Sequence, residues 1–231
     1  MYVFSTHHAT PEDGMFPDRG GEDMPRTFPN DMGWTVTLLE SYITITSLTA
    51  VACDGTAYPL EMFFGPCPED IRETDLDLVT VGGRKMPEGA YCQLVVGYGP
   101  YESPDVDVAD EENLHAVPTT TDIDGTTVFM TGGAFADPEA EDEAVEFELR
   151  MGKNITVELD LSTIDDGLPL QIAAKEDFPV ELTVSKTYDR FLDGVDFATL
   201  DEEDVEDELD NRLREATRIQ PGRQVLMFDA D

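Results

Sequence analysis

The chain has 231 residues, of which 40% are hydrophobic, and this is enough apolar material to fill one large β domain without a disulfide or a metal. Its 51 acidic and 14 basic residues give a formal net charge of −37, and four of the basic residues are lysines. That balance argues against nucleic acid as a partner, because phosphate binding needs clustered Lys and Arg, and no apolar run reaches the roughly 18 residues of a transmembrane segment.

The excess of carboxylates also predicts a solvent of high ionic strength. A surface this acidic repels itself at low ionic strength, whereas near 1 M salt the Debye length falls to about 3 Å and most of that repulsion is screened. The composition resembles that of proteins from extreme halophiles, so we expect a high-salt environment. An acidic surface that collects divalent cations is the alternative interpretation.

Three cysteines allow at most one internal disulfide. Cys53, Cys67 and Cys92 offer three pairings, and one thiol must remain free. Three reduced thiols are an equally good interpretation.

Proline and glycine dominate residues 1–33, and this pattern predicts an extended N-terminal arm. Residues 34–231 are predicted to form a single β-sandwich domain. Alternating Thr, Val, Ile and Leu predict strands over residues 34–39 and 42–51, with a kink around Ser47. Further strands are expected over residues 60–64, 76–81 and 91–98.

Residues 101–124 form an acidic connection that contains proline, and a strand is expected to follow it over residues 126–131. Two strictly alternating segments, 145–151 and 155–161, come next, each with one apolar and one polar face. Because residues 152–154 between them include a glycine, we expect a tight reversal and a hairpin. The alternation resumes at Val180, Leu182 and Val184.

One amphipathic helix is predicted near residues 200–219. Thr199 and Glu202 have the spacing of a capping box, and Val205, Leu209 and Leu213 recur every four residues. The acidic residues of this segment are expected to form its solvated face. The predicted fold class is therefore all-β, an antiparallel β-sandwich of jelly-roll or immunoglobulin-like type with one C-terminal helix.

No catalytic motif is present. The chain lacks G-x-S-x-G, a P-loop, H-E-x-x-H, C-x-x-C and G-x-G-x-x-G, and with three histidines the commonest general base is scarce. Paired carboxylates are unspecific in so acidic a chain. We therefore expect a protein that is not an enzyme.

Two kinds of metal site are conceivable. Calcium would suit the oxygen-rich loops, although neither loop has the twelve-residue spacing of an EF-hand, which favours solvated loops. Their acidic residues are Asp105, Asp107, Asp110, Glu111, Glu112, Asp122 and Asp124. A transition metal would suit the imidazoles of His7, His8 and His115, which are the candidate ligands if they converge.

Four segments carry a resemblance to a known family: FPNDMGWTVTLLESYITITSLTAVAC at 28–53, DLDLVTVGGRKMPEGAYCQLVVGYG at 75–99, TTVFMTGGAFADPEAEDEAVEFEL at 126–149 and YDRFLDGVDFATL at 188–200. In this order, before an amphipathic helix, they resemble the MbnP-like family of extracytoplasmic copper-binding proteins. The resemblance implies a secreted or periplasmic β-sandwich that binds copper through histidines, in some members with an oxidised tryptophan. Trp34 is the only tryptophan here, and no signal-peptide pattern is visible at the start of the sequence.

A rival interpretation comes from a different class of protein. Size, acidity and β-rich character also resemble the small jelly-roll capsid proteins of haloarchaeal internal-membrane viruses. In a capsid or filament subunit the N-terminal arm, with Tyr2, Val3 and Phe4, would add to the sheet of a neighbouring copy. The sequence thus predicts a non-enzymatic extracytoplasmic module, with copper binding placed ahead of self-assembly at a cell or virion surface.

Overall fold

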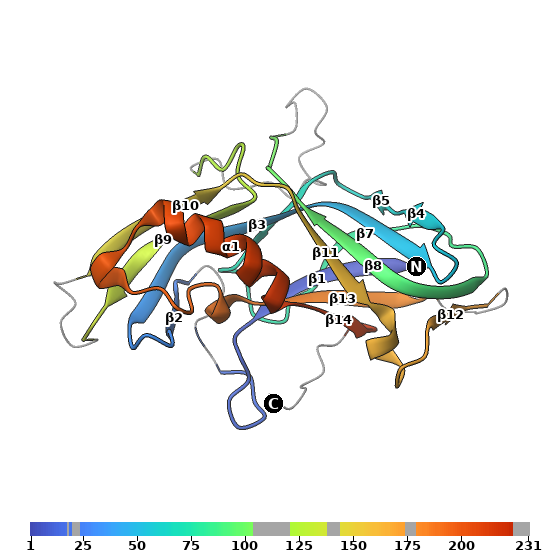
Figure 1. The fold of residues 1–231 in the computed structure, drawn as a ribbon, viewed down its shortest axis with the longest axis horizontal. Coiled ribbons are helices and arrows are strands. Elements are labelled where there is room, and N and C mark those ends of the chain that lie inside the picture. Colours follow the sequence, from blue (N-terminus) through green and yellow to red (C-terminus); the bar gives the residue numbers. More distant parts are fainter. Residues whose placement is uncertain (18, 20–23, 104–120, 138–143, 174–178, 224–231) are drawn as a thin grey trace.

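The described part of the chain forms two β-sheets and one α-helix (Figure 1). A computed structural model describes residues 1–17, 19, 24–103, 121–137, 144–173 and 179–223. The predicted all-β sandwich with one C-terminal helix is confirmed. No helix within these ranges is long and apolar enough to cross a membrane.

The larger sheet has nine strands arranged around β3 (Thr35–Ala52). One edge of β3 pairs in turn with β2 (Arg26–Pro29), β6 (Cys67–Asp70) and β4 (Ala57–Pro59). The other edge pairs first with β9 (Val128–Phe135) and then with β8 (Gly89–Tyr98). The register of β3 against β8 shifts between Ile45 and Ser47, at the position of the predicted kink.

The outer strands of this sheet continue the same arrangement. β10 (Val145–Met151) pairs with β9, whereas β11 (Ile155–Asp160) and β12 (Leu170–Ile172) pair with β8. Both strands predicted from alternation are therefore present. The hairpin that was expected to join them is wrong, because β10 and β11 lie against different neighbours.

Strand directions explain the error. β9 and β8 both run antiparallel to β3, and β10 and β11 run antiparallel to β9 and β8, so β10 and β11 point the same way. The chain passes straight through residues 152–154 instead of reversing. Gly152 is needed for a close approach, since a Cβ there would lie 2.7 Å from the carbonyl oxygen of Gly125.

The smaller sheet has the strand order β14 (Thr217–Pro221), β13 (Glu181–Thr187), β1 (Tyr2–His8), β7 (Val79–Gly83) and β5 (Glu61–Met62). β1 pairs with β13 in parallel and with β7 in antiparallel orientation. The segment expected to be an extended arm therefore opens with a strand inside a sheet. Sequence pattern alone missed it because Ser5, Thr6, His7 and His8 are polar, yet all four are buried.

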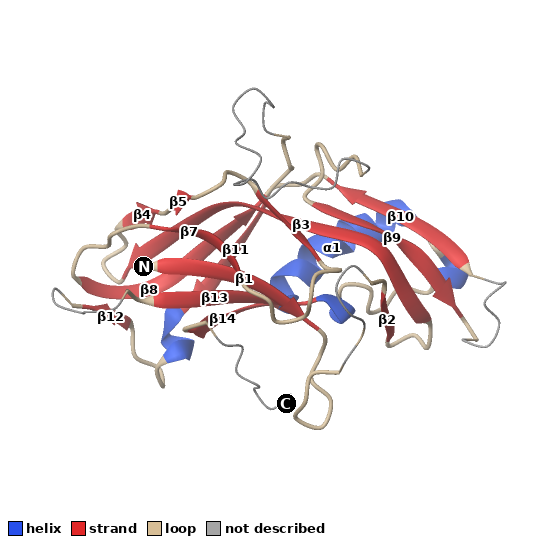
Figure 2. Ribbon diagram, turned by 180° about the vertical axis from the view of Figure 1, so that it is seen from behind, coloured by secondary structure: helices blue, strands red, loops and turns tan. Residues whose placement is uncertain are grey.

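The smaller sheet lies over the β8–β11 half of the larger sheet, and the helix α1 (Glu202–Ala216) runs along the β10–β9 half (Figures 1 and 2). Three 3-10 turns complete the described elements: η3 (Leu161–Ile164), η4 (Tyr188–Arg190) and η5 (Phe197–Thr199). Leu209, Leu213 and Ala216 form the buried face of α1. The cap is Asp201, whose carboxylate accepts from the backbone N–H of Glu203, and not Thr199, because Thr199 ends η5.

Part of the acidic face of α1 forms hydrogen bonds with the neighbouring sheet. Glu202 and Glu206 accept hydrogen bonds from the backbone N–H groups of Glu148 and Arg150 at 3.2 and 2.6 Å. Eight residues further along the helix, Arg214 donates to the carbonyl of Thr156 in β11. These helix side chains thus occupy backbone groups at the outer edge of β10 and β11, which would otherwise offer a template to another strand.

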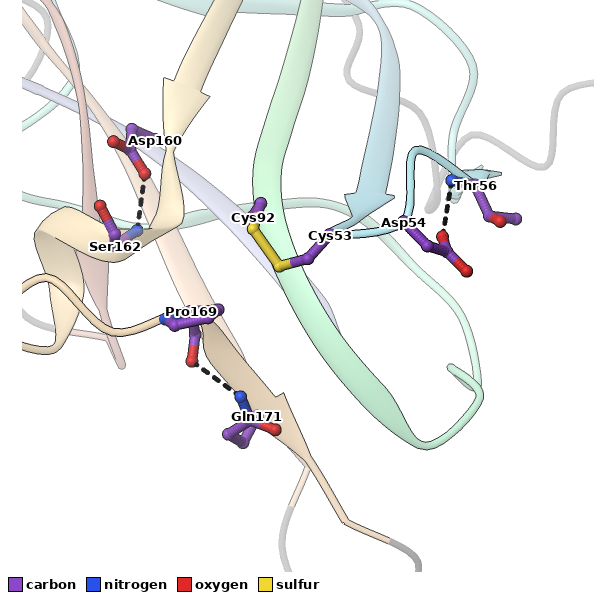
Figure 3. Close-up of a disulfide and its surroundings, with 8 residues drawn as sticks. All are labelled: Cys53, Asp54, Thr56, Cys92, Asp160, Ser162, Pro169 and Gln171. Atoms are coloured by element: carbon purple, nitrogen blue, oxygen red, sulfur yellow. Dashed lines mark hydrogen bonds between the residues drawn. A yellow bond between two sulfur atoms is a disulfide. The ribbon is translucent and has the colours of Figure 1, made fainter.

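A disulfide joins the end of β3 to β8 (Figure 3). It links Cys53 and Cys92, whose Cα atoms are 4.9 Å apart, and it closes a sequence separation of 39 residues. This selects one of the three pairings that the sequence left open. Cys67 is free and buried in the core.

We predict that replacing Glu202 and Glu206 together by Ala lowers the free energy of unfolding by about 1–2 kcal/mol, because two edge N–H groups lose their charged acceptors. It should also promote self-association through β10. Chemical denaturation and light scattering measure the two effects. The variant Glu203→Ala with Glu208→Ala removes the same charge from α1 and should show neither; equal behaviour of both pairs would contradict the edge-covering role.

Candidate functional site

Adjacent residues of β1 and β13 point to opposite faces of the smaller sheet, and this alternation separates two groups of polar side chains. In the strand register Ser5, His7 and Lys186 lie on the face toward the larger sheet, whereas Thr6, His8 and Ser185 lie on the opposite face. The first group forms a buried ionic network. His8 and Ser185 of the second group line a pocket.

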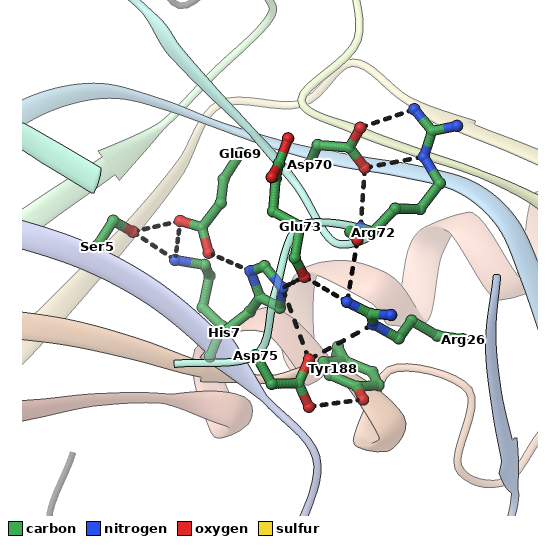
Figure 4. Close-up of polar contacts among 10 residues, drawn as sticks. Ser5, His7, Arg26, Glu69, Asp70, Arg72, Glu73, Asp75 and Tyr188 are labelled. Atoms are coloured by element: carbon green, nitrogen blue, oxygen red, sulfur yellow. Dashed lines mark hydrogen bonds and ion pairs between the residues drawn. The ribbon is translucent and has the colours of Figure 1, made fainter. Parts of the chain in front are cut away.

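The buried network is centred on Glu69 of β6 (Figure 4). One carboxylate oxygen, Oε1, accepts from His7 Nδ1 at 3.0 Å, and the other, Oε2, accepts from Ser5 Oγ at 2.5 Å and from Lys186 Nζ at 2.7 Å. Lys186 also donates to Ser5 Oγ at 2.6 Å. Glu69 is 3% and Lys186 0% exposed, so this is a fully buried ion pair that joins the two sheets.

Burial by itself would raise the pKa of Glu69, but the charge of Lys186 and the hydrogen bond from His7 outweigh it, and the pKa falls to about 2. The neighbouring thiol of Cys67 behaves in the opposite way. Burial, followed by the negative charge of Glu69, raises its pKa to about 12. Glu69 is therefore ionised and Cys67 is an unreactive thiol at neutral pH.

His7 extends the network toward Arg26. Its Nε2 contacts the carbonyl oxygen of Glu73 at 3.0 Å and lies 3.8 Å from Asp75 Oδ1. Asp75 in turn accepts from Tyr188 Oη at 3.0 Å and lies 3.4 Å from Arg26 Nε. Both ring nitrogens of His7 thus contact oxygen atoms of the protein, so neither is open to a metal ion.

His8 differs from His7 in that one of its ring nitrogens keeps a lone pair that can bind a metal ion. Its Nδ1 contacts the carbonyl oxygen of Ala9 at 2.8 Å, and since a carbonyl can only accept, Nδ1 carries the hydrogen and Nε2 carries the lone pair of the neutral ring. Burial lowers the pKa of His8, which favours that neutral form. The ring packs edge-on against Phe16, with centroids 4.9 Å apart.

The pocket lined by His8 has a volume of about 850 Å³. It lies where the edge strand β14 meets β11 and the C-terminal end of α1. Thr10 forms part of its rim and is fixed by Asp189, which accepts from the Thr10 backbone N–H at 3.0 Å and from its hydroxyl at 2.9 Å. The remaining lining mixes apolar side chains with arginines and carboxylates.

The structure does not bring the predicted ligands His7 and His8 together, because neighbouring residues of a strand face opposite ways. His115, the third candidate, lies outside the described residues. Among the residues that the structure describes, no group of three or more His, Cys, Asp or Glu side chains is placed to hold a metal ion.

Of the seven calcium candidates, the structure describes Asp122 and Asp124. Asp122 accepts from the backbone N–H of Asp124 at 3.2 Å, and Asp124 accepts from the backbone N–H and hydroxyl of Ser103 at 3.0 and 2.7 Å. These carboxylates therefore organise their own loop. The other five candidates, Asp105, Asp107, Asp110, Glu111 and Glu112, lie outside the described residues.

Sequence reasoning missed the network, although one signal was present. Lys186 continues the apolar face of Leu182 and Val184, so a charged residue stands at a core position of the predicted strand. A lysine at such a position indicates a buried partner of opposite charge. The sequence does not say which of 51 acidic residues that partner is.

Comparisons with known proteins found little. No family model matches the chain, and no curated protein matches it. Among solved structures it is similar to MbnP from Methylosinus trichosporium, with 14% sequence identity, a TM-score of 0.39, and coverage of 87% of this chain and 79% of that one. A likeness of this size carries no argument about function.

We predict that Glu69→Gln destabilises the fold by about 3–5 kcal/mol at neutral pH, because Lys186 then keeps a buried charge without its counter-ion. The pKa of Glu69 is lowered in the folded state from 4.5 to about 2. Its contribution is therefore present above about pH 4.5 and disappears as the pH falls toward 2, so the gap between variant and wild type should narrow over that range. Denaturant midpoints from pH 7 to pH 2 measure it.

Glu61→Gln makes the same change at an exposed position of β5 and serves as the control. It should leave the stability within about 0.5 kcal/mol of wild type at every pH. A gap for Glu69→Gln that stays constant with pH would contradict the assignment of the titrating group.

Proposed function

We propose that the chain is a non-enzymatic, extracytoplasmic β-sandwich that binds copper through His8 in a high-salt environment. The observation that carries the proposal is the state of His8. It is a neutral imidazole that lines a pocket, and its tautomer is set by a bond from Nδ1–H to a backbone carbonyl. Histidines that bind metals characteristically donate their other N–H in this way, and imidazole suits copper.

His8 is one ligand and not a complete site. Glu158, Asp160, Asp193 and Glu215 also line the pocket and offer carboxylate oxygens. His115 stays the predicted second imidazole. The described residues therefore supply one imidazole and several carboxylates toward a copper site. They do not favour calcium over copper.

Two further features support the extracytoplasmic and salt-adapted parts of the proposal. The Cys53–Cys92 disulfide is of the kind that persists in oxidising compartments. The net charge of −37 favours a solvent in which repulsion between carboxylates is screened.

The non-enzymatic part rests on how the buried polar groups are used. Ser5, His7 and Glu69 are the residue types of a hydrolase triad, but Ser5 donates to Glu69 and not to His7. A serine in that arrangement lacks the imidazole base of a triad, and the pKa of about 2 makes the Glu69 carboxylate a weak base. All three side chains are also buried, so no substrate reaches them.

The alternative function, a capsid or filament subunit, depended on an N-terminal arm that pairs with a neighbouring copy. In the structure β1 pairs along both edges within its own chain, with β13 and with β7. Tyr2, Val3 and Phe4 therefore have no edge to offer, and copper binding remains the better supported proposal.

We expect the protein in molar KCl to bind about one copper ion per chain, and His8→Ala to weaken that binding at least tenfold, because the ring nitrogen with the free lone pair is gone. Isothermal titration with competing chelators measures the affinity. His115→Ala tests in the same assay whether that residue completes the site.

His7→Gln is the matched control, since both nitrogens of His7 are engaged with oxygens and a glutamine amide still donates to Glu69. Its copper affinity should equal that of wild type. Copper binding that survives His8→Ala, or that is lost in His7→Gln while the fold is retained, would show that the metal is held elsewhere or not at all.

We also expect the thermal unfolding midpoint to rise as KCl increases from 0.1 M to 2 M, because screening removes repulsion among the surface carboxylates. Calorimetry at constant pH measures the shift. NaCl should act similarly, whereas a midpoint independent of salt would refute the proposed adaptation.

A further inference from the structure

The pocket that contains His8 differs in charge from the acidic chain as a whole. Four of the ten arginines of the chain line it: Arg190, Arg212, Arg214 and Arg218. The four carboxylates of the lining balance them, so the formal charge of the wall is zero, whereas the whole chain carries −37. An anion therefore meets less repulsion here than over the acidic surface.

Two of these arginines are already committed to the protein. Arg190 donates to Thr10 Oγ1 at 2.9 Å and pairs with Asp193 at 3.2 Å. Arg214 pairs with Asp210 at 2.7 Å and donates to the carbonyl of Thr156. Their guanidinium groups hold the rim and the helix in place.

The other two retain unused donors. Arg218 donates from Nη1 to the backbone carbonyls of Glu215 and Thr217 at 2.5 and 2.9 Å, and no described carboxylate pairs with it. Arg212 lies 3.7 Å from Glu215 Oε2, beyond hydrogen-bond reach, and its buried Nε has no partner. Both arginines contact Glu215, Arg212 at its side chain and Arg218 at its backbone carbonyl, and both line the pocket.

A third donor lies beside them. Ser185 is directly opposite Arg218 in the pairing of β13 with β14, so the two side chains share the outer face of the sheet. Ser185 lines the pocket and is 1% exposed, yet its hydroxyl has no hydrogen-bond partner. Buried hydroxyl groups without partners are rare in folded proteins, so this hydroxyl is a candidate donor to a ligand in the pocket.

The wall also contains the apolar side chains of Phe16, Val157, Leu159 and Ile219. A volume of about 850 Å³ is far larger than a simple ion needs and lies in the usual range for small organic ligands. The planar fork of arginine matches the oxygens of carboxylate and phosphate groups.

We propose that this pocket binds a small organic anion with an apolar body, whose carboxylate or phosphate group is held by Arg218, Arg212 and the hydroxyl of Ser185. This site does not depend on copper, because His8 contributes none of the three donors. Bound there, the anion would direct its apolar body toward Phe16, which packs against His8 on the same outer face.

The test is titration calorimetry in 1 M KCl with phenyl phosphate and phenylacetate as probes, and with benzyl alcohol as the uncharged analogue. At least one anionic probe should bind, with an affinity at least tenfold above that of benzyl alcohol. The tighter of the two identifies the preferred head group. Arg218→Gln and Arg212→Gln should each weaken binding about tenfold, and Ser185→Ala by a smaller factor.

Arg84→Gln removes the same charge outside this pocket and should leave the affinity unchanged. Circular dichroism confirms that each variant is folded, and Arg218→Lys, which keeps the charge but not the fork, should bind more weakly than wild type. Failure of both anions to bind, or equal loss in Arg84→Gln and Arg218→Gln, would overturn the proposal.

Discussion

The ion pair between Glu69 and Lys186 ties the two sheets together, and its position sets the register of the strands on which the pocket is built. Glu69 comes from β6 in the larger sheet, and Lys186 comes from β13 in the smaller one. A slip of one residue in β13 would turn Lys186 to the outer face and leave the carboxylate without its cation. Since the cost of an unpaired buried charge is several kcal/mol, this interaction favours a single register.

The same register decides what the outer face presents. With Ser5, His7 and Lys186 directed inward, Thr6, His8 and Ser185 must face outward, and pairing with β14 adds Arg218 beside Ser185. The pocket is thus the reverse side of the buried network. Its free imidazole nitrogen and its unpartnered hydroxyl both follow from an alternation that the ion pair holds in place.

Charge has separate uses in different parts of this acidic chain. Most of the carboxylates that the structure describes face solvent, but Glu202 and Glu206 of α1 accept from the edge of β10, and Glu69 is ionised within the core. The scarce cations are placed selectively. Lys186 and Arg26 are fully buried, and four arginines line one pocket. A net charge of −37 therefore coexists with local regions in which the charges balance.

The sequence by itself determined the fold class, most strand positions and the helix, because side-chain alternation and helical periodicity are local properties. The charge of Lys186 on an apolar face was a further local signal, which the sequence analysis did not use. Only the tertiary structure decided which strands pair. The hairpin expected at residues 152–154 became two strands running in the same direction, since β3 is long enough to receive two partners end to end. His7 and His8, adjacent in sequence, were separated into a buried network and a pocket, because β1 became a strand inside a sheet and its neighbouring residues face opposite sides of that sheet.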